Sequence, residues 1–313
     1  MEVVTIGPDE IRERVNIRRL VEDLREGLPG VEGGDFDTPQ RYSFGEGSGL
    51  VMASHHKRSG VSVTKCLSGN VNRSPAWQGV AVRTSPHSDG ALIAEASTVT
   101  SLRTGAIVGL ATDILADPQA SQLVVYGSGV QAPDLIRAIL AVRPVERVSV
   151  IARNAATGEE LVRVLSRERP DVAFALAQDP ASVLGSADIV CCATRAIAPL
   201  FDPEALKDRV HVNAIGSFLP TLLELSDSFL ASASLVAVDD REACLVESGE
   251  LISAIATGAL SPDNIRPLAS LLENPVPEIF GHTAFKSVGT AVLDWFLMDL
   301  LARSLNSDVG AGS

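Results

Sequence analysis

Apolar runs that alternate with helix-like segments dominate the middle of the chain. The helix-like segments include Gln131–Val142 and Thr157–Arg167. The apolar runs are Gln122–Gly127, Arg147–Arg153, Ala173–Ala177, Asp188–Thr194, Arg209–Gly216 and Ser234–Asp240. Strands covered by helices on both faces are apolar along their whole length, whereas strands with one wet face alternate. The pattern therefore predicts an α/β fold with a doubly wound parallel sheet.

The N-terminal third follows a different pattern. A charged amphipathic helix is expected over Asp9–Leu28, and after a glycine-rich stretch come the alternating segments LVMAS, GVSVTK, GVAVRT and ALIAEAS. This alternation is typical of a mostly antiparallel sheet in a separate α+β domain. A long helix over Thr98–Leu115 leads into the parallel half, and an apolar helix over Val288–Leu305 is expected to return to the first domain.

Composition excludes some partners and compartments. The 313 residues carry a formal net charge of −13 at pH 7, so we expect neither nucleic acid nor an anionic membrane surface as the main partner. Cysteine spacing matches no zinc or disulfide framework, and the N-terminus carries no secretory signal, which predicts reduced thiols and a soluble, cytoplasmic protein. The cysteines are Cys66, Cys191, Cys192 and Cys244. His55 and His56 are adjacent on a strand and point to opposite faces, so no metal site is expected.

The sharpest local signal is the segment VVYGSGVQA, with a G-x-G-x-x-A pattern at Gly127, Gly129 and Ala132. It follows a predicted strand and opens a predicted helix, which is the context in which such a loop binds the pyrophosphate of a dinucleotide. In such a loop, Gly127 would permit the tight turn and Gly129 would permit the close approach of the pyrophosphate to the backbone. Ala132 would allow the helix to pack against the strand. A plain structural turn is the alternative. The candidate cofactor-binding residues are Gly127, Ser128, Gly129, Val130 and Gln131, with Thr194 at the end of a later strand.

The end of the next strand indicates which dinucleotide is bound. An NAD site places an acidic residue there for the ribose 2′-hydroxyl, whereas an arginine accommodates the 2′-phosphate of NADP. The sequence reads VIARNAATG, with Arg153 and Asn154 and no acidic residue. NADP(H) is therefore favoured over NAD(H), unless Arg153 is an ordinary surface residue.

Motifs along nearly the whole chain resemble the ornithine cyclodeaminase/μ-crystallin family. They are SLRTGAIVGLATDILA, GSGVQA, RVHVNAIGSFLPTLLEL, VAVDDREACLVESGEL and FKSVGTAVLD, in this order. The resemblance implies a Rossmann-type dinucleotide-binding domain over 119–289, inserted in an α+β substrate-binding and dimerisation domain formed by 1–118 and 290–313. It also implies a homodimer, and hydride transfer between a nicotinamide and the α-carbon of an amino or imino acid.

Candidate substrate contacts follow from the resemblance. Arg103, in the segment LRTG, corresponds to the family's carboxylate-binding arginine, and a guanidinium suits a carboxylate because it makes two parallel hydrogen bonds. Arg41, in TPQRYSF, falls where the family has a second arginine; an exposed surface arginine is the alternative. Gln78, in WQG, matches a family position in the substrate sheet.

Further candidates lie on the cofactor side. Ser287 and Val288, in FKSVG, correspond to the family's neighbours of the nicotinamide. Asp239 and Asp240 end a predicted strand and, by the resemblance, help to shape this side; a turn or helix N-cap is the alternative.

The family's lysine has two candidate positions. It is expected eight residues before an asparagine, and in GVSVTKCLSGN eight residues before Asn70 lies Ser62, whereas Lys65 is three residues later. The odd offset puts the two side chains on opposite faces of the strand. We expect Lys65 to be the catalytic lysine; an outward-facing surface lysine is the alternative.

A second departure bears on the reaction. The cyclodeaminases carry an aspartate after N-A-x-G, where this chain has Phe218, a substrate-contact candidate that cannot exchange a proton. The resemblance therefore favours an NAD(P)-dependent imino-acid reductase or amino-acid dehydrogenase. An ornithine-type cyclodeaminase that recycles bound NAD, and a catalytically silent protein that binds NADPH or another ligand, are the alternatives.

Overall fold

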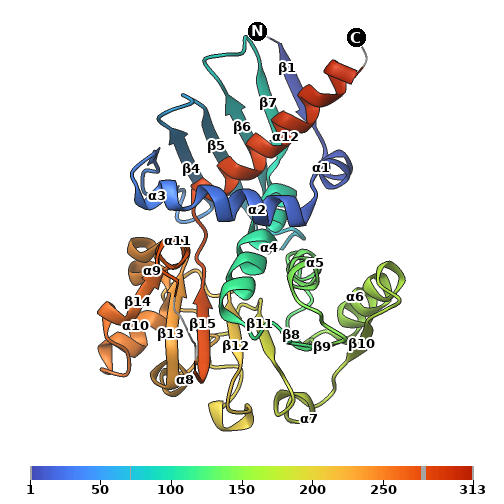
Figure 1. The fold of residues 1–313 in the computed structure, drawn as a ribbon, viewed down its shortest axis with the longest axis vertical. Helices are drawn as coiled ribbons and strands as arrows, with labels where there is room; N and C mark the ends of the chain where they lie inside the picture. The colour runs from blue at the N-terminus through green and yellow to red at the C-terminus, as the bar shows by residue number, and fades with distance from the viewer. Residues whose placement is uncertain (1, 71, 276–279, 312–313) are drawn as a thin grey trace. The chain divides into compact units, whose positions relative to one another are not determined.

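Two units make up the computed structural model, which describes residues 2–70, 72–275 and 280–311. Unit 1 consists of Met1–Ile107 and Thr290–Ser313, and unit 2 of Val108–Gly289. Unit 2 is thus inserted, in sequence, between the two segments of unit 1 (Figure 1). The first boundary falls inside helix α4 (Ala96–Leu115).

Unit 1 is built on one mixed sheet, with the strand order β1-β7-β6-β5-β4-β2 and β3 paired to β4. Its strands are β1 (Val3–Ile6), β2 (Phe36–Asp37), β3 (Tyr42–Phe44), β4 (Gly49–His56), β5 (Ser62–Gly69), β6 (Trp77–Thr84) and β7 (Ala91–Glu95). The pair β1–β7 is parallel, and the other pairs are antiparallel. The four alternating segments of the sequence are β4 to β7, and the sequence pattern missed β1 to β3 because these strands are short.

One face of this sheet is covered by the return helix α12 (Ala291–Ala311), which contacts β4 to β7 (Figure 1). Met52, Val63 and Ala81 point to this face and are buried. Helix α2 (Ile17–Gly27) packs on α12 so closely that a Cβ atom on Gly27 would lie 2.2 Å from Phe296 Cε1. The covered face is therefore a dry core, and any charge on it needs a partner.

The N-terminal helix differs from the prediction. The single helix expected over Asp9–Leu28 is two helices, α1 (Pro8–Arg14) and α2, followed by the short α3 (Pro29–Glu32). The chain leaves helical geometry at Val15, and the Asn16 side chain accepts a hydrogen bond from Arg19 N at the start of α2. An asparagine N-cap restarts the helix there, since its side chain satisfies an otherwise unpaired N–H group.

Unit 2 contains an all-parallel sheet with the strand order β10-β9-β8-β11-β12-β15-β13-β14. Its strands are β8 (Gln122–Tyr126), β9 (Arg147–Ile151), β10 (Ala173–Leu176), β11 (Ile189–Cys192), β12 (His211–Ala214), β13 (Ala233–Val238), β14 (Ile265–Pro267) and β15 (His282–Lys286). The predicted doubly wound parallel sheet is confirmed, with the six predicted strands in place. The sequence pattern missed β14, which is very short, and β15.

Helices cover both faces of the unit 2 sheet (Figure 1). They are α5 (Ala132–Val142), α6 (Ala155–Glu168), α7 (Ala181–Leu184), α8 (Asp227–Ser232), α9 (Arg241–Glu247), α10 (Gly249–Ala256) and α11 (Leu268–Glu273), with 3₁₀ turns η1 (Pro203–Ala205) and η2 (Pro262–Asn264). On one face, Phe229 of α8 and Leu251 of α10 join a core with Val190 and Val212. On the other face, Asn213 donates a buried hydrogen bond of 3.0 Å to Thr112 of α4.

The strand order reverses at β8, which has β9 on one side and β11 on the other. In doubly wound sheets, ligands bind outside the carboxyl ends of the strands at such a point. Among the described residues, no helix combines the length and the apolar composition that a membrane crossing requires.

Candidate functional site

A lysine is buried in the covered face of the unit 1 sheet. Lys65 lies on β5 between Met52 and Ala81 of the neighbouring strands and is 1% exposed. Its Nζ atom lies 2.8 Å from both carboxylate oxygens of Asp294, which is in the first turn of α12 and is also 1% exposed. Nζ also donates to the hydroxyl of Thr100 on α4, at 3.1 Å.

Arg103 joins the same cluster from α4. It is 6% exposed, and its Nε atom lies 3.4 Å from Asp294 Oδ1, with no hydrogen bond of its own. Arg41, half-buried in the loop before β3, is near enough for its charge to act on Lys65. We call Lys65, Arg103 and Asp294 the cation cluster. It contains two buried cations and one carboxylate.

The charges around Lys65 set its proton affinity. Burial lowers the pKa of Lys65 from 10.5 to about 8; Asp294 opposes this fall, whereas Arg103 and Arg41 add to it. An ammonium group with such a pKa can give up a proton near neutral pH. The cluster is thus equipped to attract an anion and to supply a proton to it.

The side-chain directions on β5 separate Lys65 from Ser62. Lys65 points into the cation cluster, whereas Ser62 is half-buried and lies 2.8 Å from His55 Nδ1 through its Oγ atom. His56 Nδ1 is similarly 2.8 Å from Ser59 Oγ, and the described residues contain no group of His, Cys, Asp or Glu side chains that could hold a metal.

Gln78 does not lie with the cation cluster. On β6 it is three residues from Ala81, the Cα partner of Lys65, so its side chain is on the other face of the sheet. There it is exposed, and its Oε1 atom accepts a hydrogen bond from Arg73 at 3.4 Å. Gln78 therefore does not share a face of the sheet with Lys65, and its role in lining the substrate pocket stays a prediction.

Asp294 is the member of the cluster that the sequence reasoning missed. The motif FKSVGTAVLD ends on it, and it is an acidic residue in an otherwise apolar segment, AVLDWFL. An isolated acid in an apolar helix is a signal for a buried charge partner, because burying it alone is costly. That signal does not say which cation it meets.

In unit 2, the glycine-rich loop connects β8 to α5 as predicted. Gly127 has φ 108°, and a Cβ atom there would lie 2.5 Å from the carbonyl oxygen of Ala193. Around Gly129, in contrast, a Cβ atom would meet nothing within 4 Å. The first glycine is required by the turn itself, and the second leaves open space at the start of a helix, where a pyrophosphate fits. Ser128, Val130 and Gln131 complete this loop.

Arg153 and Asn154 follow β9, the strand next to the loop. Arg153 is exposed, whereas the Asn154 side chain caps α6 by accepting hydrogen bonds from Ala156 N and Thr157 N. The Ser128 hydroxyl lies 2.7 Å from the Thr157 hydroxyl and links the loop to this cap. Arg153 is therefore the one of the pair whose side chain is not used by the local structure, which suits a phosphate contact.

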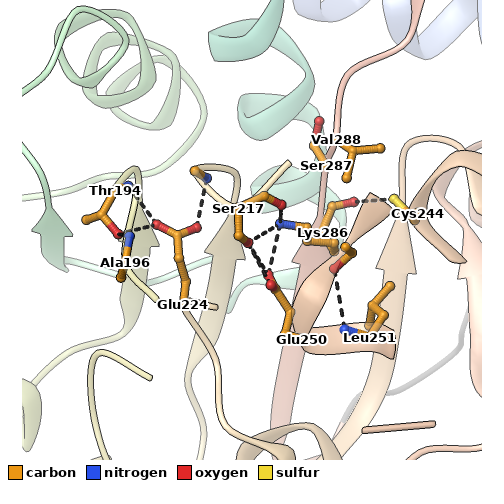
Figure 2. A network of polar contacts seen from close by, with 12 residues as sticks. Thr194, Ala196, Ser217, Glu224, Cys244, Glu250, Leu251, Lys286, Ser287 and Val288 are labelled. Carbon is orange, nitrogen blue, oxygen red and sulfur yellow. Dashed lines mark hydrogen bonds and ion pairs between the residues drawn. The ribbon is translucent and has the colours of Figure 1, made fainter. Parts of the chain in front are cut away.

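Thr194 follows β11 and is held by a buried carboxylate (Figure 2). Glu224 accepts hydrogen bonds from Thr194 N at 2.6 Å and the Thr194 hydroxyl at 2.8 Å, and from Gly216 N at 2.7 Å. A Cβ atom on Gly216 would lie 1.9 Å from Thr194 O. The two loops after β11 and β12 are thus in direct contact, and the Thr194 hydroxyl is engaged in joining them.

Ser287 and Val288 follow β15 and are held by Asp239. The Asp239 carboxylate accepts hydrogen bonds from the Ser287 hydroxyl at 2.6 Å, from Gly289 N at 2.8 Å and from Val288 N at 3.3 Å. Asp240 caps α9 through Ala243 N. The N-cap alternative therefore holds for Asp240, and Asp239 instead organises the loop that follows β15.

Phe218, which the resemblance places at the aspartate position of the cyclodeaminases, is half-buried against the unit 2 core. It brings no titratable group to the loop after β12. The Ser217 side chain beside it is fully buried and bonded to Glu250 at 2.6 Å.

Comparison with known proteins extends these observations over the whole chain. The model of the ornithine cyclodeaminase/mu-crystallin family matches residues 4–302. A Delta(1)-pyrroline-2-carboxylate reductase of Bacillus cereus is 36% identical over 223 residues, which are 69% of this chain and 67% of that protein. One of Paracoccus denitrificans is 35% identical over 256 residues, 78% of each.

Solved structures share the fold. The Delta(1)-pyrroline-2-carboxylate reductase of Thermococcus litoralis, in complex with NADH and L-proline, has a TM-score of 0.90 at 21% identity, with 98% of each chain covered. A probable ornithine cyclodeaminase from Bordetella pertussis has a TM-score of 0.88 at 28% identity, also with 98% of each chain covered. An archaeal alanine dehydrogenase dimer with bound NAD has a TM-score of 0.88 at 21% identity, with 98% of this chain and 97% of that chain covered.

The two glycines of the loop predict opposite results when each is replaced by alanine. We expect Gly127→Ala to lower the free energy of unfolding by about 1–3 kcal/mol, because the positive φ and the Ala193 carbonyl both oppose a Cβ atom. Gly129→Ala should change it by less than about 0.5 kcal/mol but weaken NADPH binding, since the methyl group enters the open space. Urea unfolding and NADPH fluorescence titration measure the two effects, and an unaltered NADPH affinity of Gly129→Ala would contradict the phosphate assignment.

Proposed function

The chain belongs to the ornithine cyclodeaminase/mu-crystallin family, and from this premise we propose that it is an NADP(H)-dependent imino-acid reductase. Its substrate is a cyclic imine that carries a carboxylate on the imine carbon, such as Δ1-pyrroline-2-carboxylate. The observation that carries the proposal is the excess of positive charge in the buried cation cluster of unit 1.

The cation cluster supports binding of a carboxylate. Asp294 balances one of the two buried cations, Lys65 and Arg103, and Arg41 adds a further positive charge nearby. A buried positive charge without a counter-ion is unfavourable, and an incoming carboxylate supplies one. Arg103 and Arg41 would bind the substrate carboxylate, because guanidinium groups match its geometry.

Lys65 would supply the proton that imine reduction consumes. When bound, the reduced nicotinamide supplies a hydride to the imine carbon. The imine nitrogen must gain a proton in the same conversion, so that the C=N bond becomes a C–N bond with one hydrogen on each atom. The Lys65 ammonium group would donate that proton, with Asp294 holding its Nζ atom in place.

Phe218 supports a reductase rather than a cyclodeaminase. Cyclodeamination needs an acid–base group for a second amine, and Phe218 packs its ring on the unit 2 core where that group would stand. Reduction of a cyclic imine needs no such second group.

We also propose that NADP(H) is the preferred dinucleotide. Arg153 is exposed after β9, next to the strand that carries the glycine-rich loop, and the segment VIARNAATG brings no acidic side chain for a ribose 2′-hydroxyl. A guanidinium in this place would pair with a 2′-phosphate.

The face of the unit 1 sheet opposite helix α12 supports the homodimer that the family implies. Strand pairing aligns Tyr42, Val51, Cys66 and Val80 across this face, and Tyr42 is 68% and Val80 43% exposed. A contiguous exposed apolar patch is a feature of subunit interfaces.

Sedimentation equilibrium should give twice the chain mass of 32.9 kDa, and Val80→Lys should shift the protein towards monomer. A wild-type chain that sediments as a monomer would rule out the dimer.

A cytoplasmic location is proposed on the state of the thiols. The four cysteines are free, and Cys191, Cys192 and Cys244 are buried. Free thiols suit a reducing compartment, and localisation of a tagged full-length chain tests this.

The reaction itself is tested by following NADPH absorbance with two matched imines. We expect turnover with Δ1-pyrroline-2-carboxylate and none with 1-pyrroline, which lacks the carboxylate. Arg103→Met should raise KM for the carboxylate substrate about tenfold to a hundredfold, the value of one charged hydrogen bond. Equal turnover of both imines would contradict the carboxylate assignment, and NADPH binding without turnover of any imino acid would contradict the enzyme assignment.

The activity should depend on the ionisation of Lys65. Because the reduction uses its protonated form, kcat/KM should fall as the pH rises through about 8. Asp294→Asn removes the charge that raises the pKa of Lys65, so this fall should move to lower pH by about 1–3 units. Asp299→Asn is the matched control, since Asp299 is on the same helix but pairs with Arg83 at 2.8 Å. Coincident profiles for the two variants would rule out Lys65 as the proton donor.

Dinucleotide choice is tested at Arg153. Arg153→Ala should weaken NADPH binding about tenfold or more, because a charged hydrogen bond is lost, and leave NADH binding unaltered. Arg163→Ala, an exposed arginine of α6 paired with Glu160, is the control and should affect neither. Fluorescence titration gives both dissociation constants, and equal losses for NADPH and NADH would overturn the assignment.

A further inference from the structure

A fully buried ion pair lies at the carboxyl edge of the unit 2 sheet, outside the residues assigned above to the dinucleotide. Lys286 is the last residue of β15 and is 1% exposed, and Glu250 is in the first turn of α10 and is 0% exposed. Lys286 Nζ lies 2.9 Å from Glu250 Oε1. Neither residue takes part in the proposed proton transfer or in phosphate binding.

Ser217 links this ion pair to the loop after β12 (Figure 2). Its hydroxyl is 2.6 and 2.7 Å from the two Glu250 oxygens, and Lys286 Nζ donates to both its hydroxyl and its backbone carbonyl oxygen at 2.5 Å. We call Ser217, Glu250 and Lys286 the edge network. It fixes the end of β15 and the loop after β12 to one another.

The burial of two charges makes the edge network costly in free energy. Removing two charges from water costs more than an apolar contact of the same size, so stability alone does not account for it. Its members are well bonded, which is the condition under which a buried polar network holds one unique arrangement. We therefore expect the network to serve a second purpose, which is to hold the residues next to it in a fixed position.

Those residues lie on the side of the sheet edge where the nicotinamide half of a bound dinucleotide would lie. Arg153 follows β9, on one side of the glycine-rich loop after β8, so the rest of a bound dinucleotide extends to the other side, over β11, β12 and β15. The chain continues from Ser217 into Phe218 and from Lys286 into Ser287 and Val288. The edge network thus lies directly beneath the segments that leave the sheet on this side.

We propose that Glu250 and Lys286, through Ser217, are positioning residues for the nicotinamide half of the dinucleotide. The inference rests on the proposed dinucleotide binding. Two neighbouring carboxylates extend the same construction, because Glu224 joins the loops after β11 and β12, and Asp239 holds the backbone of Val288 and Gly289. Successive hydrogen-bonded carboxylates therefore hold the edge on which the nicotinamide would rest.

The test compares a ligand that has a nicotinamide with one that lacks it. The double variant Lys286→Met, Glu250→Met removes both charges together, so that neither is left buried alone. Calorimetric titration of the full chain should give a dissociation constant for 2′,5′-ADP within about twofold of the wild type, and one for NADPH raised by about tenfold or more, since small displacements of a bound group are costly. The fluorescence of bound NADPH, which reports on the nicotinamide environment, should change as well.

Two further variants control for folding. Lys207→Met removes an ion pair with Asp188 at the amino edge of the same sheet and should alter neither dissociation constant. Ser217→Ala keeps the ion pair and removes only the hydroxyl, and it should weaken NADPH selectively; it decides the question if the double variant does not fold by circular dichroism.

The outcomes separate this inference from the proposed function. Parallel weakening of NADPH and 2′,5′-ADP, or no change in either, would overturn the positioning role. A wild-type chain that binds NADPH but reduces no imino acid overturns the reductase proposal alone, whereas a wild-type chain that does not bind NADPH overturns both.

Discussion

Burying a charged side chain is costly unless that side chain is paired or well hydrogen-bonded, and both functional regions of this chain depend on that constraint. In unit 1 the buried lysine is Lys65, and its carboxylate comes from Asp294, far along the sequence. In unit 2 it is Lys286, and its carboxylate is Glu250. In each case the pair joins a strand to a helix, β5 to α12 in unit 1 and β15 to α10 in unit 2. The packing of the helix that carries the carboxylate therefore determines which lysine can be buried as a cation.

The return of the chain to unit 1 brings the carboxylate that this constraint requires. Helix α12 lies on the covered face of the unit 1 sheet, and its first turn places Asp294 next to Lys65 and Arg103. Without Asp294, burial and the nearby arginines would all lower the pKa of Lys65, and the ammonium group that we propose as the proton donor would lose its proton. With Asp294, the cluster keeps its protonated lysine and still has an excess of positive charge for a carboxylate.

Local sequence was sufficient for features that involve neighbouring residues. The glycine-rich loop, the six apolar strands and Arg153 at the end of β9 could all be predicted, because strand, turn and helix lie within one short segment. Strand β15 could not, since Thr283 and Lys286 are polar and their burial is compensated by partners on other elements. Gln78 shows a related limit: a match to a segment does not say which face of the strand a side chain occupies, and the register of β6 with β5 puts Gln78 on the other face of the sheet from Lys65.

The sequence by itself determined the class of fold, the dinucleotide loop and the presence of an arginine and a lysine suited to an amino or imino acid. Those features depend on periodicity and on residue type, both of which are local. Only the tertiary structure decided that Lys65 rather than Ser62 is in the cluster, that Asp294 is its partner, and that Ser217, Glu250 and Lys286 meet at one edge of the sheet. These outcomes depend on which distant segments are packed together, because a buried charge is defined by its partner, and the partner is brought by folding.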